Sequence, residues 1–98
     1  MKVRNDPRVD KQIRKLPDSE SARIVNVIEL FIDSGFQLSE NYLKKLTADV
    51  WELRAGRYRL LFGTVGSIAL IVSVFMKKTQ KTPKKEIKLA EQRLQEYR

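Results

Sequence analysis

The sequence contains no cysteine and no histidine, and only three prolines and four glycines among 98 residues. Without cysteine, disulfides and thiolate chemistry are excluded. Without histidine, imidazole acid–base catalysis is excluded, and zinc or iron sites of the usual kind are not expected. No uncharged run reaches the roughly 20 residues of a membrane-spanning helix, and the charged N-terminus lacks the apolar stretch of a signal peptide. We therefore expect a cytoplasmic protein that uses no metal, no cofactor and no membrane.

Positive charge is abundant and unevenly distributed. The chain carries 20 Lys and Arg against 12 Asp and Glu, a net charge of +8. Residues 1–50 hold nine basic and eight acidic side chains, a balance of +1, whereas residues 51–98 hold eleven and four, a balance of +7. Such a one-sided excess predicts a polyanionic partner, nucleic acid above all. The alternative is a basic surface without a ligand.

Length and patterning predict a single α+β domain over residues 1–98. Apolar residues recur at helical spacing from Val9 to Leu16, and Pro17 ends this stripe. Asp18 is the expected N-cap of a second helix, which Gly35 closes. The expected buried face of that helix consists of Ile24, Val27, Ile28, Phe31 and Ile32. The two helices should form a hairpin that lies across a sheet.

The pattern changes to alternation at Val50. The segment "VWELRAGRYRLLFG" predicts two strands joined by a tight turn at Ala55-Gly56. The resulting register pairs Arg54 with Arg57, Leu53 with Tyr58, Glu52 with Arg59 and Trp51 with Leu60. One face should be core, with Trp51, Leu53, Tyr58, Leu60 and Phe62, and the other should carry Glu52, Arg54, Arg57 and Arg59. The segment "IALIVSVFM" is apolar on both faces, which predicts a strand inside the sheet.

A last helix is expected after six lysines in residues 77–88. Thr82 fits its N-cap and Pro83 its first position. The packing residues at helical spacing are Ile87, Ala90, Leu94 and Tyr97. The predicted order is thus two helices, three antiparallel strands and a helix. The helices should cover only the apolar face, and the polar face should remain a shallow basic groove.

Arginines gathered on one strand face predict an anion site. Like charges directly opposite each other are destabilising unless something negative lies between them, and the planar arginine fork matches a phosphate. The alternative is a solvated face with a weak Glu52–Arg59 surface pair. Lys77 and Lys78 could turn over the groove, or could be solvated charges that flank an apolar strand. Trp51 is expected to pack in the core rather than to stack on bases.

The segments "LKKLTADVWELRAGRYRLLF" and "FMKKTQKTPKKEI" together resemble the HigB-type branch of the RelE/ParE toxin superfamily, including its phage-derived members. The resemblance covers roughly residues 43–97. It implies a helical hairpin held by a small antiparallel sheet. It also implies a toxin that enters the ribosomal A site and cuts mRNA, neutralised by an antitoxin that in this branch usually has a helix-turn-helix domain.

The resemblance also implies site residues. Relatives place a catalytic or phosphate-holding arginine in the "YR" strand, and Arg59 matches it. The expected catalytic set is Arg59, Arg54, Lys77, Lys78 and Glu52, and the expected RNA-binding set is Arg57, Lys81, Lys84 and Lys85. The expected reaction is metal-independent attack of a ribose 2′-OH on the adjacent phosphate, with Glu52 more suited to orient Arg59 than to act as the base. Many relatives have a histidine where this chain has Ser73.

Three other functions fit the same residues. A gyrase-directed toxin of the superfamily would arrest replication and leave mRNA intact. A non-catalytic module would bind RNA or DNA through the basic groove without cutting it. A phage relative that folds but no longer cuts also fits the missing histidine.

Overall fold

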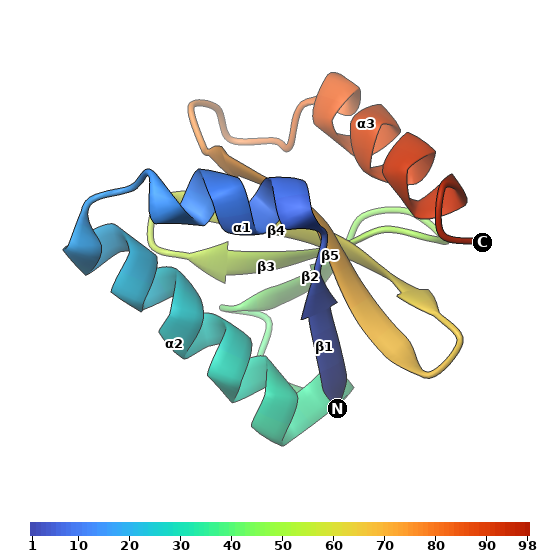
Figure 1. Cartoon of the computed structure of the whole chain (residues 1–98), viewed down its shortest axis with the longest axis horizontal. Coiled ribbons are helices and arrows are strands. Elements are labelled where there is room, and N and C mark those ends of the chain that lie inside the picture. Colours follow the sequence, from blue (N-terminus) through green and yellow to red (C-terminus); the bar gives the residue numbers. More distant parts are fainter.

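The structure, a computed structural model, describes all residues from Met1 to Arg98 (Figure 1). The strands are β1 (Lys2–Asn5), β2 (Leu43–Lys45), β3 (Trp51–Ala55), β4 (Tyr58–Val65) and β5 (Ile68–Met76). The helices are α1 (Pro7–Arg14), α2 (Asp18–Ser34), the short 3-10 helix η1 (Gly35–Gln37) and α3 (Lys84–Gln95). The strands form one sheet in the order β1-β5-β4-β3-β2. The predicted α+β class is therefore confirmed, with the helical hairpin and the C-terminal helix in place.

The sheet is larger than the sequence predicted. Three antiparallel strands were expected, whereas the sheet has five strands, and β1 runs parallel to β5. The unpredicted strands, β1 and β2, are short edge strands of four and three residues. Neither has an alternating apolar pattern, so only pairing with a neighbour identifies them. The expectation that β5 lies inside the sheet is confirmed, because β1 and β4 flank it.

The ends of α2 agree with the sequence in part. Gly35 ends the helix with a positive φ of 58°, which a glycine adopts without a Cβ clash. Asp18 was expected to cap the helix, but it is the first helical residue and Pro17 occupies the cap position without a side-chain bond. Of the expected buried face, Ile24, Val27 and Phe31 are buried and Ile28 is partly buried, whereas Ile32 is exposed.

The β3–β4 hairpin forms, but its predicted register was wrong by two residues. The observed pairs are Ala55 with Tyr58, Arg54 with Arg59, Leu53 with Leu60, Glu52 with Leu61 and Trp51 with Phe62. The turn is Gly56-Arg57, and Gly56 has a φ of 63°, which suits the first central position of a type II′ turn. An even shift leaves every strand residue on its predicted face. Only Arg57 leaves the polar face, because it now lies in the turn.

The helices cover both faces of the sheet, which corrects the expectation that they cover one. The larger core lies under α1 and α2 and includes the expected hairpin residues Leu53, Tyr58, Leu60 and Phe62, with Trp51 packed against it. A second core on the opposite face consists of Val50, Leu61, Leu70, Val72, Ala90 and Leu94. Ala90 and Leu94 belong to α3, which Figure 1 shows packed apart from the other helices. The polar face is therefore half covered, and what remains of it is a pocket rather than an open groove.

The start of α3 also differs from expectation. The helix begins at Lys84, with Pro83 at the cap position and no side-chain cap bond. Thr82 therefore does not cap the helix, and its hydroxyl binds a residue of β3 instead. Tyr97 anchors the end of the helix as expected, because its hydroxyl donates to Asp6 Oδ2 at 2.8 Å. None of the helices is both long and apolar enough to cross a bilayer.

Candidate functional site

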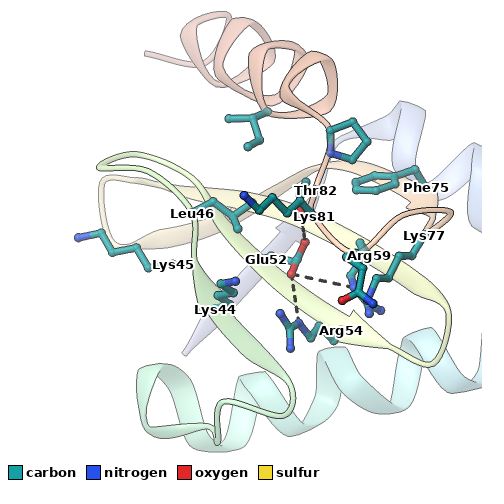
Figure 2. A pocket seen from close by; sticks show the side chains of 13 residues that line it. Lys44, Lys45, Leu46, Glu52, Arg54, Arg59, Phe75, Lys77, Lys81 and Thr82 are labelled. Carbon is teal, nitrogen blue, oxygen red and sulfur yellow. Dashed lines mark hydrogen bonds and ion pairs between the residues drawn. The ribbon is translucent and has the colours of Figure 1, made fainter.

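A pocket of about 240 Å³ lies where the polar face of the β3–β4 hairpin meets the segment that leads to α3 (Figure 2). Its side chains come from strands β2 to β5, from the segment that leads to α3 and from α3 itself. The lining residues are Lys44, Lys45, Leu46, Glu52, Arg54, Arg59, Phe75, Lys77, Gln80, Lys81, Thr82, Pro83 and Ile87. Only one lining side chain is acidic and six are basic, so the pocket has a strongly positive potential.

Glu52 lies at the centre of the pocket and is only 2% exposed (Figure 2). Its Oε2 accepts a hydrogen bond from Arg54 Nε at 3.2 Å and lies 4.0 Å from Arg59 Nε. Its Oε1 accepts a hydrogen bond from the Thr82 hydroxyl. A buried carboxylate is costly unless it is paired and hydrogen-bonded. These contacts meet that requirement, and they correct the alternative of a solvated Glu52–Arg59 surface pair.

Arg59 is held rigidly beside Glu52. Its Nη1 donates to the backbone carbonyls of Gly56 at 2.8 Å and Tyr58 at 2.9 Å, and the residue is 8% exposed. Burial lowers the pKa of the guanidinium below its usual value, and the nearby charge of Glu52 opposes that shift. The guanidinium is thus fixed by the backbone of its own hairpin, and it lines the pocket next to Arg54.

The predicted lysines separate into two groups. Lys77 and Lys81 line the pocket, and the Lys77 amide donates to Arg57 O at 2.7 Å, which fixes the point where the chain leaves β5. Lys78 lies outside, in an adjoining hollow with Lys77, Thr79 and Gln80. Lys84 and Lys85 do not line the pocket either.

Arg57 lies away from the pocket because of the register. Its Nε donates to Glu20 Oε1 at 3.0 Å, on the side of the sheet that α2 covers. Tyr58 donates its hydroxyl to the other oxygen of the same carboxylate. The bond to Arg57 is the main cause that lowers the pKa of Glu20. This contact ties the hairpin tip to the start of α2, so Arg57 does not join Arg54 and Arg59.

Sequence reasoning missed four polar residues of the pocket, Lys44, Lys45, Gln80 and Thr82. Lys44 pairs with Glu52 across β2 and β3, so it lies on the same face. The quoted "LKK" segment contains Lys44, but no strand was predicted there, so the face on which its side chain lies could not be inferred. Thr82 was assigned to a helix cap. Ser73, at the position where many relatives have histidine, is buried and does not line the pocket.

The arrangement suits a phosphodiester. Two guanidinium groups held by a buried carboxylate can donate to the non-bridging oxygens of one phosphate, and arginine has the matching fork geometry. Lysines at the rim add charge for the neighbouring phosphates. No group of three or more acidic, histidine or cysteine side chains is placed to hold a metal ion. The side chains of the pocket supply positive charge from arginine and lysine around one carboxylate.

Comparisons with known proteins identify the family of the chain. Residues 11–95 match the family described as phage-derived protein Gp49-like. The protein named "Probable endoribonuclease HigB1" from Mycobacterium tuberculosis is 30% identical over 88 residues, which are 86% of this chain and 69% of that protein.

Solved structures show the same fold at lower identity. The RelE–RelB complex from Pyrococcus horikoshii OT3 contains a chain with a TM-score of 0.64 and 17% identity, over 79% of this chain and 94% of that one. The isolated Escherichia coli RelE toxin gives a TM-score of 0.61 and 19% identity, over 89% of this chain and 95% of that one. The chain therefore belongs to the Gp49-like family, has a HigB-type relative, and has the fold of the RelE toxins.

Proposed function

We propose that this protein is the toxin of a type II toxin–antitoxin system and that it cuts mRNA on the ribosome. The observation that carries the proposal is the buried Glu52 paired with Arg54 and Arg59 inside a lysine-rimmed pocket. The relative at 30% identity, named a probable endoribonuclease, supports the same chemistry. An enzyme that acts on translated mRNA works in the cytoplasm, and we place this protein there.

The proposed reaction needs no metal. The ribose 2′-oxygen forms a bond to phosphorus while the bond from phosphorus to the 5′-oxygen breaks, which leaves a 2′,3′-cyclic phosphate and a 5′-hydroxyl. Arg59 and Arg54 stabilise the charge on the non-bridging oxygens, and Lys77 supplies the proton or charge for the leaving 5′-oxygen. Removing one such donor commonly costs about 10²–10³ in rate.

Glu52 acts in this proposal as a positioning residue for the arginines. Both of its oxygens already accept hydrogen bonds, from Arg54 and Thr82. A base must be free to take the 2′-OH proton within hydrogen-bond reach. A lysine ammonium has no lone pair to accept a proton, so in this proposal the 2′-OH proton passes to a group of the ribosome, and the rim lysines Lys44 and Lys81 supply positive charge.

We also propose a protein antitoxin as the partner. Two structures with this fold are complexes of RelE with RelB, from Pyrococcus horikoshii and Methanococcus jannaschii. The resemblance of the sequence to the HigB branch adds a helix-turn-helix domain on that antitoxin. A neighbouring gene for a small helix-turn-helix protein, whose co-expression relieves growth arrest, is the expected observation.

The proposed function is tested by expression in a bacterial host. Wild type should arrest growth and cut mRNA on ribosomes, and Arg59→Ala should abolish both. Arg57→Ala is the matched control, because it removes an arginine of the same hairpin outside the pocket. Equal toxicity of wild type and Arg59→Ala would contradict the role of Arg59. Replication arrest with intact mRNA would instead indicate a gyrase-directed toxin.

A further inference from the structure

A second hollow adjoins the phosphate pocket around the edge strand β2. It is lined by Phe36, Leu38, Glu40, Leu43, Lys44, Lys45, Trp51 and Arg54. Three of these residues, Lys44, Lys45 and Arg54, also line the pocket that contains Glu52. The two hollows therefore meet at the edge of the sheet, at a shared wall of three cations, and one extended ligand could pass around β2 from one hollow to the other.

The second hollow contains an aromatic surface. Phe36 is 43% exposed, and its ring centroid lies 4.8 Å from that of Trp51. Trp51 is half-buried and stacks on the buried Phe62 with an interplanar angle of 18°. The core therefore holds these rings in place, although part of Phe36 and Trp51 faces solvent. The prediction that Trp51 packs on the core is confirmed, and the same residue also lines a hollow.

A cation lies beside the aromatic surface. Lys45 pairs with Trp51 across β2 and β3, and its Nζ lies 5.5 Å from the centroid of the indole. Figure 2 shows this side chain directed away from Glu52 and the other pocket residues. The ammonium can therefore meet a phosphate next to a base that lies on the rings, rather than the phosphate held by Arg59.

We propose that this aromatic hollow binds a base of single-stranded RNA, next to the nucleotide whose phosphate lies between Arg54 and Arg59. Aromatic platforms flanked by cations are how proteins bind single strands, because every base has a π-face and every linkage a negative charge. A purely apolar ligand would leave the cations of the shared wall without a partner. The inference rests on the proposed function in one respect, that the polyanion is RNA.

The protein carries its own probe for this site, because Trp51 is the only tryptophan in the chain. The experiment is a fluorescence titration with a 2′-O-methyl pentanucleotide, which lacks the attacking hydroxyl and is not cut. A series with one abasic position at a time separates the base from the phosphates. We expect saturable quenching by the full strand. At one position, removal of the base should abolish the quenching and weaken binding about tenfold or more.

Variants of Phe36 test whether the base binds in this hollow. Phe36→Ala should weaken binding of the full strand about tenfold and leave the affinity of the abasic strand unchanged. Phe36→Leu keeps apolar volume without a π-face, so it gives the same result even if the alanine variant folds poorly. The matched control is Leu30→Ala, because Leu30 is 41% exposed on α2 and lines neither hollow.

The outcomes separate this inference from the proposed function. If Arg59-dependent cleavage occurs but no strand quenches Trp51, or full and abasic strands bind equally, the base site is overturned and the nuclease stands. Base-dependent quenching without any cleavage would support the base site and count against the nuclease. Quenching by an acidic peptide but by no oligonucleotide would assign the hollow to a protein partner and overturn the inference.

Discussion

At the scale of single residues, the centre of the site is a carboxylate surrounded by cations. Glu52 is almost fully buried, yet the polar face of the β3–β4 hairpin carries two arginines and the pocket adds lysines. Its negative charge makes it possible for Arg54 and Arg59 to lie opposite each other in the hairpin without a bound anion. The same charge competes with a phosphate for those arginines, so Glu52 should oppose RNA binding while it organises catalysis.

Glu52→Gln separates these two effects. Removing the negative charge should tighten RNA binding, and the loss of fixed arginine positions should lower the cleavage rate about tenfold to a hundredfold. The measurement is the rate at saturating ribosomes, together with RNA affinity in a salt-matched buffer. A general base would behave differently: its loss would cost up to about 10⁴ in rate and remove the acidic limb of the pH profile. That pattern would contradict the positioning role.

At the scale of elements, the segment from Lys77 to Pro83 brings two lysines over the pocket. One end is fixed where the Lys77 amide binds Arg57 O, and the other where the Thr82 hydroxyl binds Glu52. This segment has no helical or strand structure of its own beyond these contacts. The position of Lys81 therefore depends on the Thr82–Glu52 hydrogen bond.

Thr82→Val tests that dependence with nearly the same side-chain shape. A hydrogen bond to a charged group contributes about 1.5–3 kcal/mol, so cleavage should fall roughly tenfold to a hundredfold. Thr82→Ser keeps the hydroxyl and should keep most of the activity. The rates of ribosome-dependent cleavage are compared at equal fractions of folded protein. If valine and serine variants were equally active, the contact would not position the segment.

A second element-scale feature is the close approach of α3 to β4 at Gly63. A Cβ at this position would lie 2.6 Å from Leu94 Cδ1 and 2.7 Å from the backbone oxygen of Asp49. The backbone atom cannot rotate away, so Gly63→Ala should destabilise the fold by about 1–3 kcal/mol. Urea unfolding measures the change, with Thr64→Ala at the exposed neighbour as control. Unchanged stability of Gly63→Ala would show that α3 moves freely on the sheet.

At the scale of the whole molecule, one buried aspartate joins the two ends of the chain. Asp6 is 1% exposed, caps α1 through the Arg8 amide, and accepts the Tyr97 hydroxyl from the end of α3. The hydrogen bond from the Arg8 side chain is the main cause that holds the pKa of Asp6 far below its usual value. The ionised form therefore stabilises the folded protein.

The lowered pKa of Asp6 makes the free energy of unfolding depend on pH. Because the pKa of Asp6 is lower in the folded than in the unfolded chain, its contribution is complete above about pH 4 and is lost as the pH falls further. Asp6→Asn should lower the free energy of unfolding by about 1–2 kcal/mol at pH 7, since half-exposed Arg8 is partly screened. The difference from wild type, measured by urea unfolding, should shrink below pH 4. A constant difference down to pH 2 would contradict the assignment.

The charge of the whole molecule predicts how RNA binding depends on salt. With a net charge of +8 and the cations concentrated around one pocket, affinity should fall steeply with salt concentration. Lys81→Ala should reduce the slope of log affinity against log salt by about 0.7, the value for one contact to a single-stranded phosphate. Lys11→Ala removes an exposed lysine of α1 and should leave the slope unchanged. Equal slopes for both variants would place Lys81 outside the RNA path.

The sequence by itself determined the features that depend on neighbours along the chain. Alternation in β3 and β4 assigned Glu52, Arg54 and Arg59 to one face, and that assignment survived a two-residue error in register because the shift was even. The end of α2 was predictable because glycine adopts a positive φ without a Cβ clash, and Gly35 has such a φ in the structure. The charge excess and the "YR" and "KK" segments indicated where a polyanion would bind.

Only the tertiary structure decided how those residues meet. The edge strands, the burial of Glu52 and the place of Lys44 depend on pairing between distant segments, which no local pattern records. Thr82 has the properties of a helix cap in the sequence, but in the fold its hydroxyl binds a carboxylate 30 residues away. The packing of α3 on the second face turned an expected groove into a pocket, because burying Ala90 and Leu94 against the sheet stabilises the helix there.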